Sequence, residues 1–230
     1  MPIPVFTIDG VLPPYVGPTG PGGAPSDMTP YVVSPLEVIT TLGQTTIRQV
    51  ILRKWFQHRA ALRALGVAEG FQWLDGSFCE DKVPGDLDIV TLFYRPAGAV
   101  TNVAAELLRL NNPTVFRRLQ VKETYNLDAF FVDLNSHPTS MINYTRYLLG
   151  LFSHRRDDEI WKGMLQVDLL DAQGDAEGLA ELDRLEAAAS DVDATEDASL
   201  AGEVERQAGI PASSRFRTYG IPSSIEQRAA

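Results

Sequence analysis

The spacing of apolar positions predicts two successive helices in the first third of the chain. Ser34-Pro35-Leu36-Glu37 has the form of a capping box with proline at the first helical position, so a short helix begins there and ends near Gly43. A longer helix is predicted from about Thr45 to Leu65, with Gly66 as a natural stop. The residues of its apolar stripe are three or four positions apart, as on one buried helical face: Ile47, Ile51, Trp55, His58, Leu62 and Leu65. His58 lies on or beside this stripe, and we interpret it as a packed histidine and not as a ligand.

Four later stretches have the pattern of β-strands. Residues 71–75, 86–94 and 125–134 are rich in apolar side chains, and 86–94 is apolar on both faces after its opening aspartates, as expected of an internal strand. Residues 160–170 alternate apolar and polar side chains, which predicts an edge strand. Lys162 in this stretch either reaches a phosphate or protects the sheet edge.

Predicted helices alternate with these strands. They cover residues 101–110, 113–123 and 175–189, together with a helix that opens at His137-Pro138 and ends at His154-Arg155-Arg156. The dipole of that helix is enough to explain cations at its C-terminal end. The pattern predicts an α/β (α+β) fold, in which a mixed central sheet of about four to five strands is flanked by helices.

The composition divides the chain into four parts. Residues 1–33 are an extended arm rich in proline and glycine, 34–170 form the core, 171–190 are a C-terminal helix, and 191–230 are an acidic, flexible tail. The arm carries apolar residues that a disordered tail would lack: Val5, Phe6, Ile8, Val11, Leu12 and Tyr15. We therefore expect it to lie in a groove, either of its own subunit or of a partner, which leaves open a homodimer or a protein partner bound through the arm.

The negative charge belongs to the C-terminal part. The net charge is -10, and residues 171–206 alone hold twelve acidic side chains against two basic ones. The rest of the chain is therefore close to neutral, which argues against a broad nucleic-acid-binding surface but is compatible with a small basic patch. With no apolar run long enough to span a bilayer and no signal peptide, we predict a cytoplasmic protein without membrane contact. The single cysteine, Cys79, is interpreted as a packed thiol.

The candidate chemistry lies between Phe71 and Tyr94, FQWLDGSFCEDKVPGDLDIVTLFY. Side chains alternate along a strand, so Asp86 and Asp88 point the same way, with Cα atoms roughly 6.5 to 7 Å apart. Two such carboxylates suit Mg²⁺, which accepts one or two carboxylates and fills its other positions with water and phosphate oxygens. Gly76 permits a tight turn, and the N–H groups of Gly76 and Ser77 form a concavity suited to phosphate. A triphosphate fits between the Gly76-Ser77 turn and a metal held by Asp86 and Asp88.

Gly76-Ser77 followed after eight residues by Asp86-Leu87-Asp88-Ile89 resembles the signature of the DNA-polymerase-beta-like nucleotidyltransferase superfamily. With GVLPPYVGP (Gly10 to Pro18) and NLDAFFVDL, it is similar to an uncharacterised bacterial branch of nucleotidyltransferase-like proteins, over roughly residues 1 to 170. The resemblance implies a nucleotidyltransferase fold and a third carboxylate on a neighbouring strand. Asp128 is preferred because it opens its strand as Asp86 and Asp88 open theirs; Asp133, on the other face, is the alternative.

The resemblance implies transfer of a nucleoside monophosphate from a nucleoside triphosphate to an acceptor hydroxyl, with release of pyrophosphate. One or two Mg²⁺ ions, or Mn²⁺, would lie on Asp86, Asp88 and Asp128, and Asp128 would act as the base. Lys82 and Lys162 are expected to contact the triphosphate, whereas Arg117, Arg118 and Lys122 are interpreted as a solvated helical face. The acceptor, an RNA end, a protein or a small molecule, stays open. The alternative is a binding or regulatory protein of the same fold, such as a toxin-antitoxin or phage-defence partner.

Overall fold

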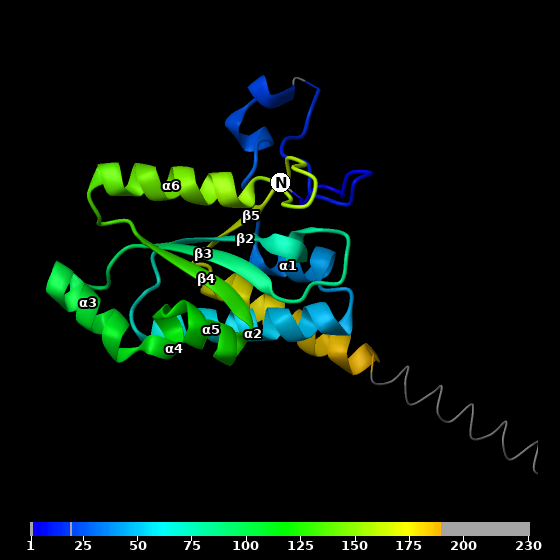
Figure 1. The fold of residues 1–230 in the computed structure, drawn as a ribbon. Coiled ribbons are helices and arrows are strands. Elements are labelled where there is room, and N and C mark those ends of the chain that lie inside the picture. Colours follow the sequence, from blue (N-terminus) through cyan, green and yellow to red (C-terminus); the bar gives the residue numbers. More distant parts are fainter. Residues whose placement is uncertain (1, 19, 190–230) are drawn as a thin grey trace, which may run out of the picture. The chain divides into compact units, whose positions relative to one another are not determined.

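A mixed sheet of five strands lies at the centre of the computed structural model, which describes residues 2–18 and 20–189 (Figure 1). Across the sheet the strands follow the order β1 (Tyr31–Val32), β5 (Leu165–Asp168), β2 (Gly70–Asp75), β3 (Leu87–Phe93) and β4 (Leu127–Asp133). β1 is parallel to β5 and β3 is parallel to β4, while β2 is antiparallel to both of its neighbours. The predicted mixed sheet flanked by helices is thereby confirmed.

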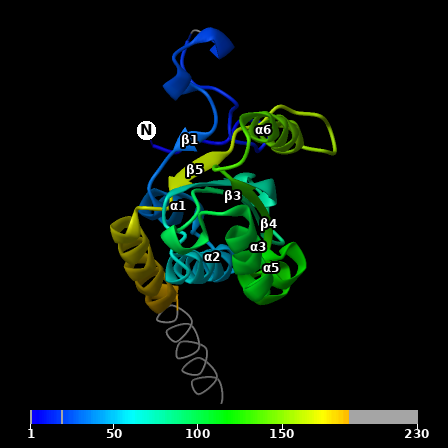
Figure 2. The same ribbon diagram turned by 90° about the vertical axis from the view of Figure 1, so that its left-hand side faces the viewer.

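Helices cover both faces of this sheet, and the described residues up to Ala188 form one compact unit. In Figures 1 and 2, α6 lies on one face and α2 and α5 lie on the other. The helices are α1 (Pro35–Leu42), α2 (Thr46–Ala64), α3 (Asn102–Asn111), α4 (Pro113–Phe116), α5 (Arg118–Tyr125), α6 (Pro138–Phe152) and a last one over residues 172–189.

Strand residues alternate between two apolar cores. Trp73, Val90 and Val132 pack with Leu148 and Phe152 of α6. Leu74, Ile89 and Ala129, which point to the other face of the same strands, pack instead with Leu52 and Trp55 of α2. The strands are thus apolar on both faces, as predicted for an internal strand.

The two N-terminal helices follow the sequence prediction closely. Ser34 Oγ accepts a hydrogen bond from the Glu37 N–H at 3.2 Å, and the Glu37 carboxylate accepts one from the Ser34 N–H at 2.7 Å. His58 is fully buried, with Nε2 3.0 Å from the carbonyl oxygen of Val115. Burial lowers the pKa of His58 to about 4, so the ring is neutral. Cys79 is also buried, and both packing predictions are confirmed.

The predicted helix over 113–123 is wrong, because the chain breaks at Arg117. Arg117 is extended (φ -92°, ψ 119°) and separates α4 from α5. In an unbroken helix, Phe116 and Val121 would lie about 140° apart around the axis. The break lets both side chains be buried, Phe116 against Phe93 and Val121 in the core beside α2.

The predicted strand within 160–170 is found, but its extent and its edge position are wrong. β5 begins only at Leu165 and lies between β1 and β2 inside the sheet. The residues before it serve another purpose, since the Gly163 N–H donates to the Leu12 carbonyl at 2.7 Å. A Cβ on Gly163 would lie 2.4 Å from the carbonyl oxygen of Pro13, so this approach of the arm requires glycine.

The N-terminal arm is part of the core of its own subunit. Ile3, Leu12 and Val33 are buried in the same cluster as the α2 side chains, and Tyr31–Val32 supplies the outer strand β1. The groove predicted for the arm is therefore on its own subunit for Val11 and Leu12, whereas Val5 and Ile8, expected in the same groove, are exposed. The predicted tail, 191–230, lies outside the described residues. Within the part of the chain that the structure describes, no helix has the length and apolar character needed to cross a membrane.

Candidate functional site

Three aspartates stand side by side at one end of the sheet, and we call them the acid row: Asp75, Asp88 and Asp128. Asp75 is directly opposite Asp88 in the β2–β3 pair, and Asp88 is level with Asp128 in the β3–β4 pair. Residues level with one another on neighbouring strands point to the same face. This is the α6 face, because Trp73 and Val90, two positions from Asp75 and Asp88, belong to the α6 core.

Gly76 brings the turn after β2 against the acid row. Its φ is +73°, a conformation that favours glycine, and a Cβ there would lie 1.7 Å from Asp88 Oδ2. Any other residue would have to displace the Asp88 carboxylate. The following residues, Gly76–Cys79, form a 3₁₀ turn that carries Ser77. The predicted meeting of a glycine turn and an aspartate is therefore found in the structure.

Arg48 of α2 holds this turn from behind, which the sequence did not indicate. Its guanidinium donates to the carbonyl oxygens of Phe78 (2.7 Å), Glu80 (2.7 Å) and Lys82 (3.0 Å). Only 7% of Arg48 is exposed, so these three bonds satisfy a buried cation and fix the backbone that carries Ser77 and Lys82.

Lys162 fastens the turn from the other side. Its buried ammonium group lies 2.9 Å from Asp75 Oδ1 and 3.1 Å from Glu80 Oε1, and it donates to the Gly76 carbonyl at 3.0 Å. Lys162 precedes β5 and protects no sheet edge, so that alternative is wrong. With three chain acceptors around it, the lysine holds the Gly76 turn in place. Its direct contact with a triphosphate stays a prediction.

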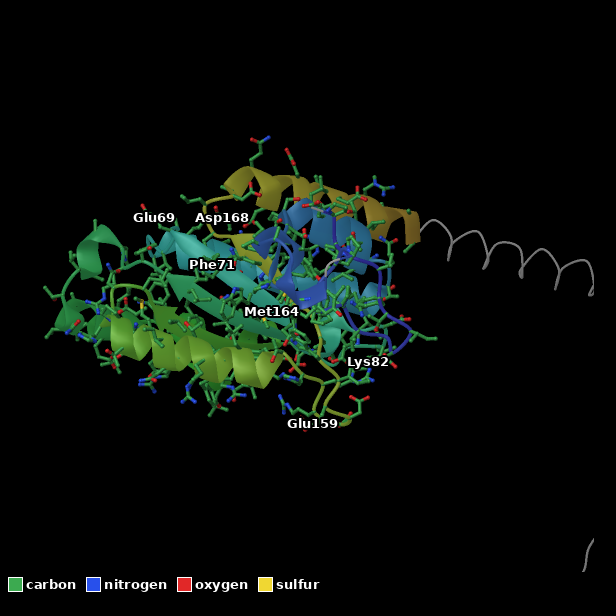
Figure 3. The ribbon with its side chains drawn as sticks, turned by 90° about the horizontal axis from the view of Figure 1, so that it is seen from above. Glu69, Phe71, Lys82, Glu159, Met164 and Asp168 are labelled. Atoms are coloured by element: carbon green, nitrogen blue, oxygen red, sulfur yellow. The ribbon has the colours of Figure 1, made fainter. Side chains whose placement is uncertain are left out.

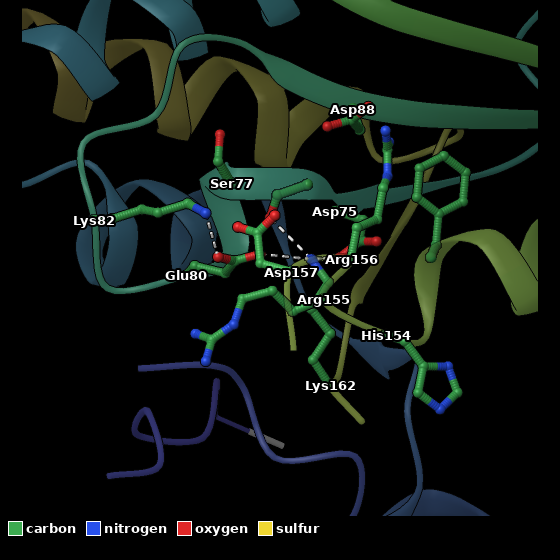
Figure 4. Close-up of a pocket in the computed structure, with 12 residues that line it drawn as sticks. Asp75, Ser77, Glu80, Lys82, Asp88, His154, Arg155, Arg156, Asp157 and Lys162 are labelled. Carbon is green, nitrogen blue, oxygen red and sulfur yellow. Dashed lines mark hydrogen bonds and ion pairs between the residues drawn. The ribbon is translucent and has the colours of Figure 1, made fainter. Parts of the chain in front are cut away.

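A polar pocket of about 240 Å³ opens beside the acid row (Figure 4). It collects five of the residues that the sequence singled out: Gly76, Ser77, Lys82, Asp88 and Lys162. Lys82 lies 2.6 Å from Glu80 Oε2 at its rim. Figure 3 shows that Lys82 and Phe71 lie toward opposite ends of the molecule, and that the loop carrying Glu159 is at the Lys82 end.

The loop after α6 supplies the cations that the sequence analysis assigned to a helix end. α6 stops at Phe152, so His154, Arg155 and Arg156 lie beyond it and line the pocket. Arg156 reaches toward Asp88 in Figure 4. The sequence pattern alone suggested cations that interact with the helix dipole. Their place in the pocket follows only from the position of the loop in the structure.

Asp86 and Asp128 lie beside the pocket, each paired with a cation of α5. Asp86 pairs with Lys122, and Asp128 is held by two donors of Arg118, one of them 2.6 Å away. The interpretation of Arg118 and Lys122 as only a solvated face is therefore wrong, whereas Arg117 is exposed. Both pairs join the start of a strand to the helix beneath it.

Asp133, the alternative third carboxylate, is at the far end of β4. It accepts a hydrogen bond from Arg95 at 2.7 Å and lies 3.3 Å from Arg109. It also accepts the Asn135 N–H at 2.9 Å, which fits the interpretation that it stabilises the chain ahead of the next helix. The preference for Asp128 agrees with the register, since Asp128 and not Asp133 is level with Asp88.

The three carboxylates of the acid row have different proton affinities. Burial, and then the charge of Asp128, raise the pKa of Asp88. The hydrogen bonds from Arg118 instead hold the pKa of Asp128 below its usual value. Asp75 is completely buried, and burial raises its pKa to about 7 although Lys162 opposes the shift. The sequence analysis did not select Asp75, even though it directly precedes Gly76.

Mg²⁺ requires oxygen ligands, of which one or two carboxylates are enough. Within residues 2–18 and 20–189, no three His, Cys, Asp or Glu side chains are gathered in the way of a ready metal centre. Among the described residues the Asp88 carboxylate has no ion pair or hydrogen bond, and it lines the pocket together with Asp75, which is held by Lys162. The Asp88 carboxylate, without a partner in this polar pocket, fits Mg²⁺, which accepts one or two carboxylates and keeps most of its water ligands.

The raised pKa of Asp75 predicts a specific dependence of stability on pH. Its ordinary value is 3.8 and its folded value is about 7, so between these values the folded chain keeps a proton that the unfolded chain has lost. Stability conferred by this group is therefore lost as the pH rises from about 4 to about 7. Asp75→Asn cannot ionise, so its melting temperature should rise relative to the wild type over this range and level off above it. If the melting temperature of Asp75→Asn instead fell relative to the wild type as the pH rises, the ion pair with Lys162 would outweigh the cost of burying the Asp75 charge.

Comparison with known proteins gives one match. The family model described as "Family of unknown function (DUF6932)" matches residues 4–168, a span that contains all five strands and the acid row. No curated protein and no solved structure matches the chain.

Proposed function

We propose that this chain, which belongs to the family of unknown function DUF6932, is a Mg²⁺-dependent nucleotidyltransferase. It would move a nucleoside monophosphate from a nucleoside triphosphate to an acceptor hydroxyl and release pyrophosphate. One observation carries the proposal: Asp88 is desolvated and unpaired among the described residues, and it faces a glycine turn in a pocket lined with cations.

The turn and the cations would bind the triphosphate. The N–H groups that follow Gly76 and the Ser77 hydroxyl are donors at the pocket, and such turns accept phosphate oxygens. Lys82 and Arg156 line the same pocket and would neutralise the charge that builds up on the leaving pyrophosphate. Lys162, Asp75 and Arg48 would keep the turn in position.

Asp88 would hold the metal. Asp86 and Asp128 would join it after the metal has replaced their present partners, Lys122 and Arg118. Bound Mg²⁺ would supply charge neutralisation at the attacking and leaving oxygens. While Arg118 holds it, Asp128 has a lowered pKa and is a weak base. Arg118 must therefore move away before Asp128 can accept a proton from the acceptor hydroxyl.

A second candidate is a binding or regulatory protein that uses the same fold without catalysis, such as a toxin-antitoxin or phage-defence partner. One observation favours it: Asp75, Asp86 and Asp128 are each neutralised by a cation of the chain itself. A site of this kind can be stable without any metal.

Nucleotide-induced stabilisation separates the two candidates. Thermal unfolding of the full chain is measured with each nucleoside triphosphate, with and without Mg²⁺, and labelled triphosphate is then incubated with cell lysate as the source of acceptor. The enzyme is expected to melt at a higher temperature only with triphosphate and Mg²⁺ together, and to transfer label to one acceptor class. No shift and no label would refute the enzymatic proposal.

A further inference from the structure

The two cations of α5 that pair with carboxylates of the site lie one helical turn apart. Arg118 is the first residue of α5 and Lys122 is the fifth, so their side chains share one side of the helix. Arg118 holds Asp128 through two donors, and Lys122 pairs with Asp86. We call these two ion pairs the α5 latch. Asp88, which has no partner among the described residues, is level with Asp128 and two residues from Asp86.

The α5 latch is accessible to water, so a competing cation can open it. The side chains of Arg118 and Lys122 are 57% and 39% exposed, and exposed ion pairs of this kind contribute little to stability. A divalent ion attracts each carboxylate more strongly than a single guanidinium or ammonium group does. Arg118 also keeps a second contact after release, because its guanidinium lies 4.6 Å from the centre of the Phe130 ring.

The first turn of α5 depends on Asp128 for its counter-charge. The backbone N–H groups give a helix N-terminus a partial positive charge, so a cation at the first helical position is unfavourable there. Arg118 occupies this position, and α5 has neither an acidic residue in its first turn nor a side-chain cap. The Asp128 carboxylate offsets both the guanidinium and the helix end. If Asp128 turns to a metal, the first turn loses this compensation.

The rest of α5 is held independently of the latch. Val121 is fully buried in the core that also contains α2 side chains. Asn126 ends the helix with a φ of 55°, and its side-chain amide donates to the carbonyl oxygen of Gly85 at 2.9 Å. Before the helix, the chain is extended at Arg117. Opening of the latch would therefore loosen the first turn and leave the body of α5 in place.

We infer that the α5 latch competes with the metal for Asp86 and Asp128, and that metal binding loosens the first turn of α5. The inference rests on the proposed function in one respect, because it takes the metal site from it. Asp88 is the carboxylate that a metal can reach without breaking a contact, and the two outer carboxylates follow as the latch opens. Metal affinity is thereby coupled to the conformation of a helix, and both quantities can be measured without any transfer reaction.

The test is titration of the full chain with Mn²⁺ alone, in which the free ion is measured by electron paramagnetic resonance. Arg118→Met/Lys122→Met keeps the apolar stems and should bind Mn²⁺ roughly 10-fold more tightly than the wild type. Arg117→Met/Arg146→Met is the matched control, because it removes the same charge from exposed side chains that have no ion pair among the described residues. Hydrogen exchange of the wild type should become faster in the peptide that covers α5 when Mn²⁺ is added.

Equal Mn²⁺ affinities of the latch variant and the wild type would overturn the inference but leave the metal site of the proposed function in place. Equal tightening in the control variant would also overturn it, because net charge and not the ion pairs would then set the affinity. Slower exchange in α5 on addition of Mn²⁺ would contradict the loosening of its first turn. Asp88→Asn should weaken Mn²⁺ binding in both backgrounds. No binding of Mn²⁺ by any of these proteins would instead overturn the proposed function, and the inference with it.

Discussion

Asp88→Asn is expected to lower the rate of nucleotide transfer by about 10³-fold without lowering the stability of the fold. A bound metal stabilises the transition state by several kcal/mol, and each 1.36 kcal/mol corresponds to about a factor of ten in rate. Asp88 lines the pocket without a partner among the described residues, and burial raises its pKa. Replacing this charge removes an unfavourable interaction with Asp128, so the variant should melt at the same or a higher temperature.

The measurement is the single-turnover rate with saturating triphosphate, together with thermal unfolding of the same samples. Asp81→Asn is the matched control, because Asp81 is an exposed acid of the same loop and does not line the pocket. Asp128→Asn should also lose activity, whereas Asp133→Asn should lose stability and keep its rate, since its partners are Arg95 and Arg109. Full activity of Asp88→Asn would show that catalysis, if present, takes place elsewhere.

The local parts of the fold could be predicted because their signals are local. The capping box at Ser34 and Glu37 and the one-sided apolar stripe of α2 act within one helix, so the sequence shows them directly. The same holds for the turn at Gly76, whose positive φ follows from a Gly-Ser pair at the end of a strand. The boundaries of α1, α2, β2 and β3 therefore lie within about two residues of those predicted.

Features that depend on distant contacts could not be predicted. β1 has only two residues, too few for a period, and it exists because β5 offers a free edge to Tyr31. Lys162 looked like an edge lysine, since nothing near it in sequence indicates that its partners are Asp75 and Glu80. The role of Arg48 could not be predicted from the sequence either, because its three acceptors are about thirty residues away and are all backbone carbonyls.

Asp75 is the one missed residue for which a signal was present. An acidic side chain at the end of an apolar strand, directly before a glycine turn and facing a second acid, costs folding free energy. Such a residue is therefore a candidate for a functional role. The register of β2 and β3 places Asp75 opposite Asp88, and a hairpin pairing of 71–75 with 86–94 could have been inferred from the sequence. Its partner Lys162, in contrast, becomes visible only when β5 is placed beside β2.

Asp175→Asn is expected to lower the free energy of unfolding by about 3 to 5 kcal/mol, because it leaves a buried guanidinium without its counter-ion. Arg59 is completely buried in α2, and its Nε lies 2.8 Å from Asp175 Oδ1 in the helix over residues 172–189. Arg63 pairs with the same carboxylate. For a domain of this size the change corresponds to a melting temperature lower by roughly 10 °C.

The matched control for Asp175 is on the same helix. Asp183 pairs with Arg53 at 2.6 Å, but its side chain is 69% exposed, so Asp183→Asn should change the free energy of unfolding by less than about 1 kcal/mol. Arg59 also donates to Gln72 Oε1 in β2 and to the carbonyl oxygen of Asp168 in β5. Since these strands lead to Asp75 and Lys162, loss of Asp175 should destabilise the helix and the site together, in one unfolding transition. Equal melting temperatures for the two variants would contradict the assigned role of the buried pair, and two separate transitions would show that the last helix is not coupled to the sheet.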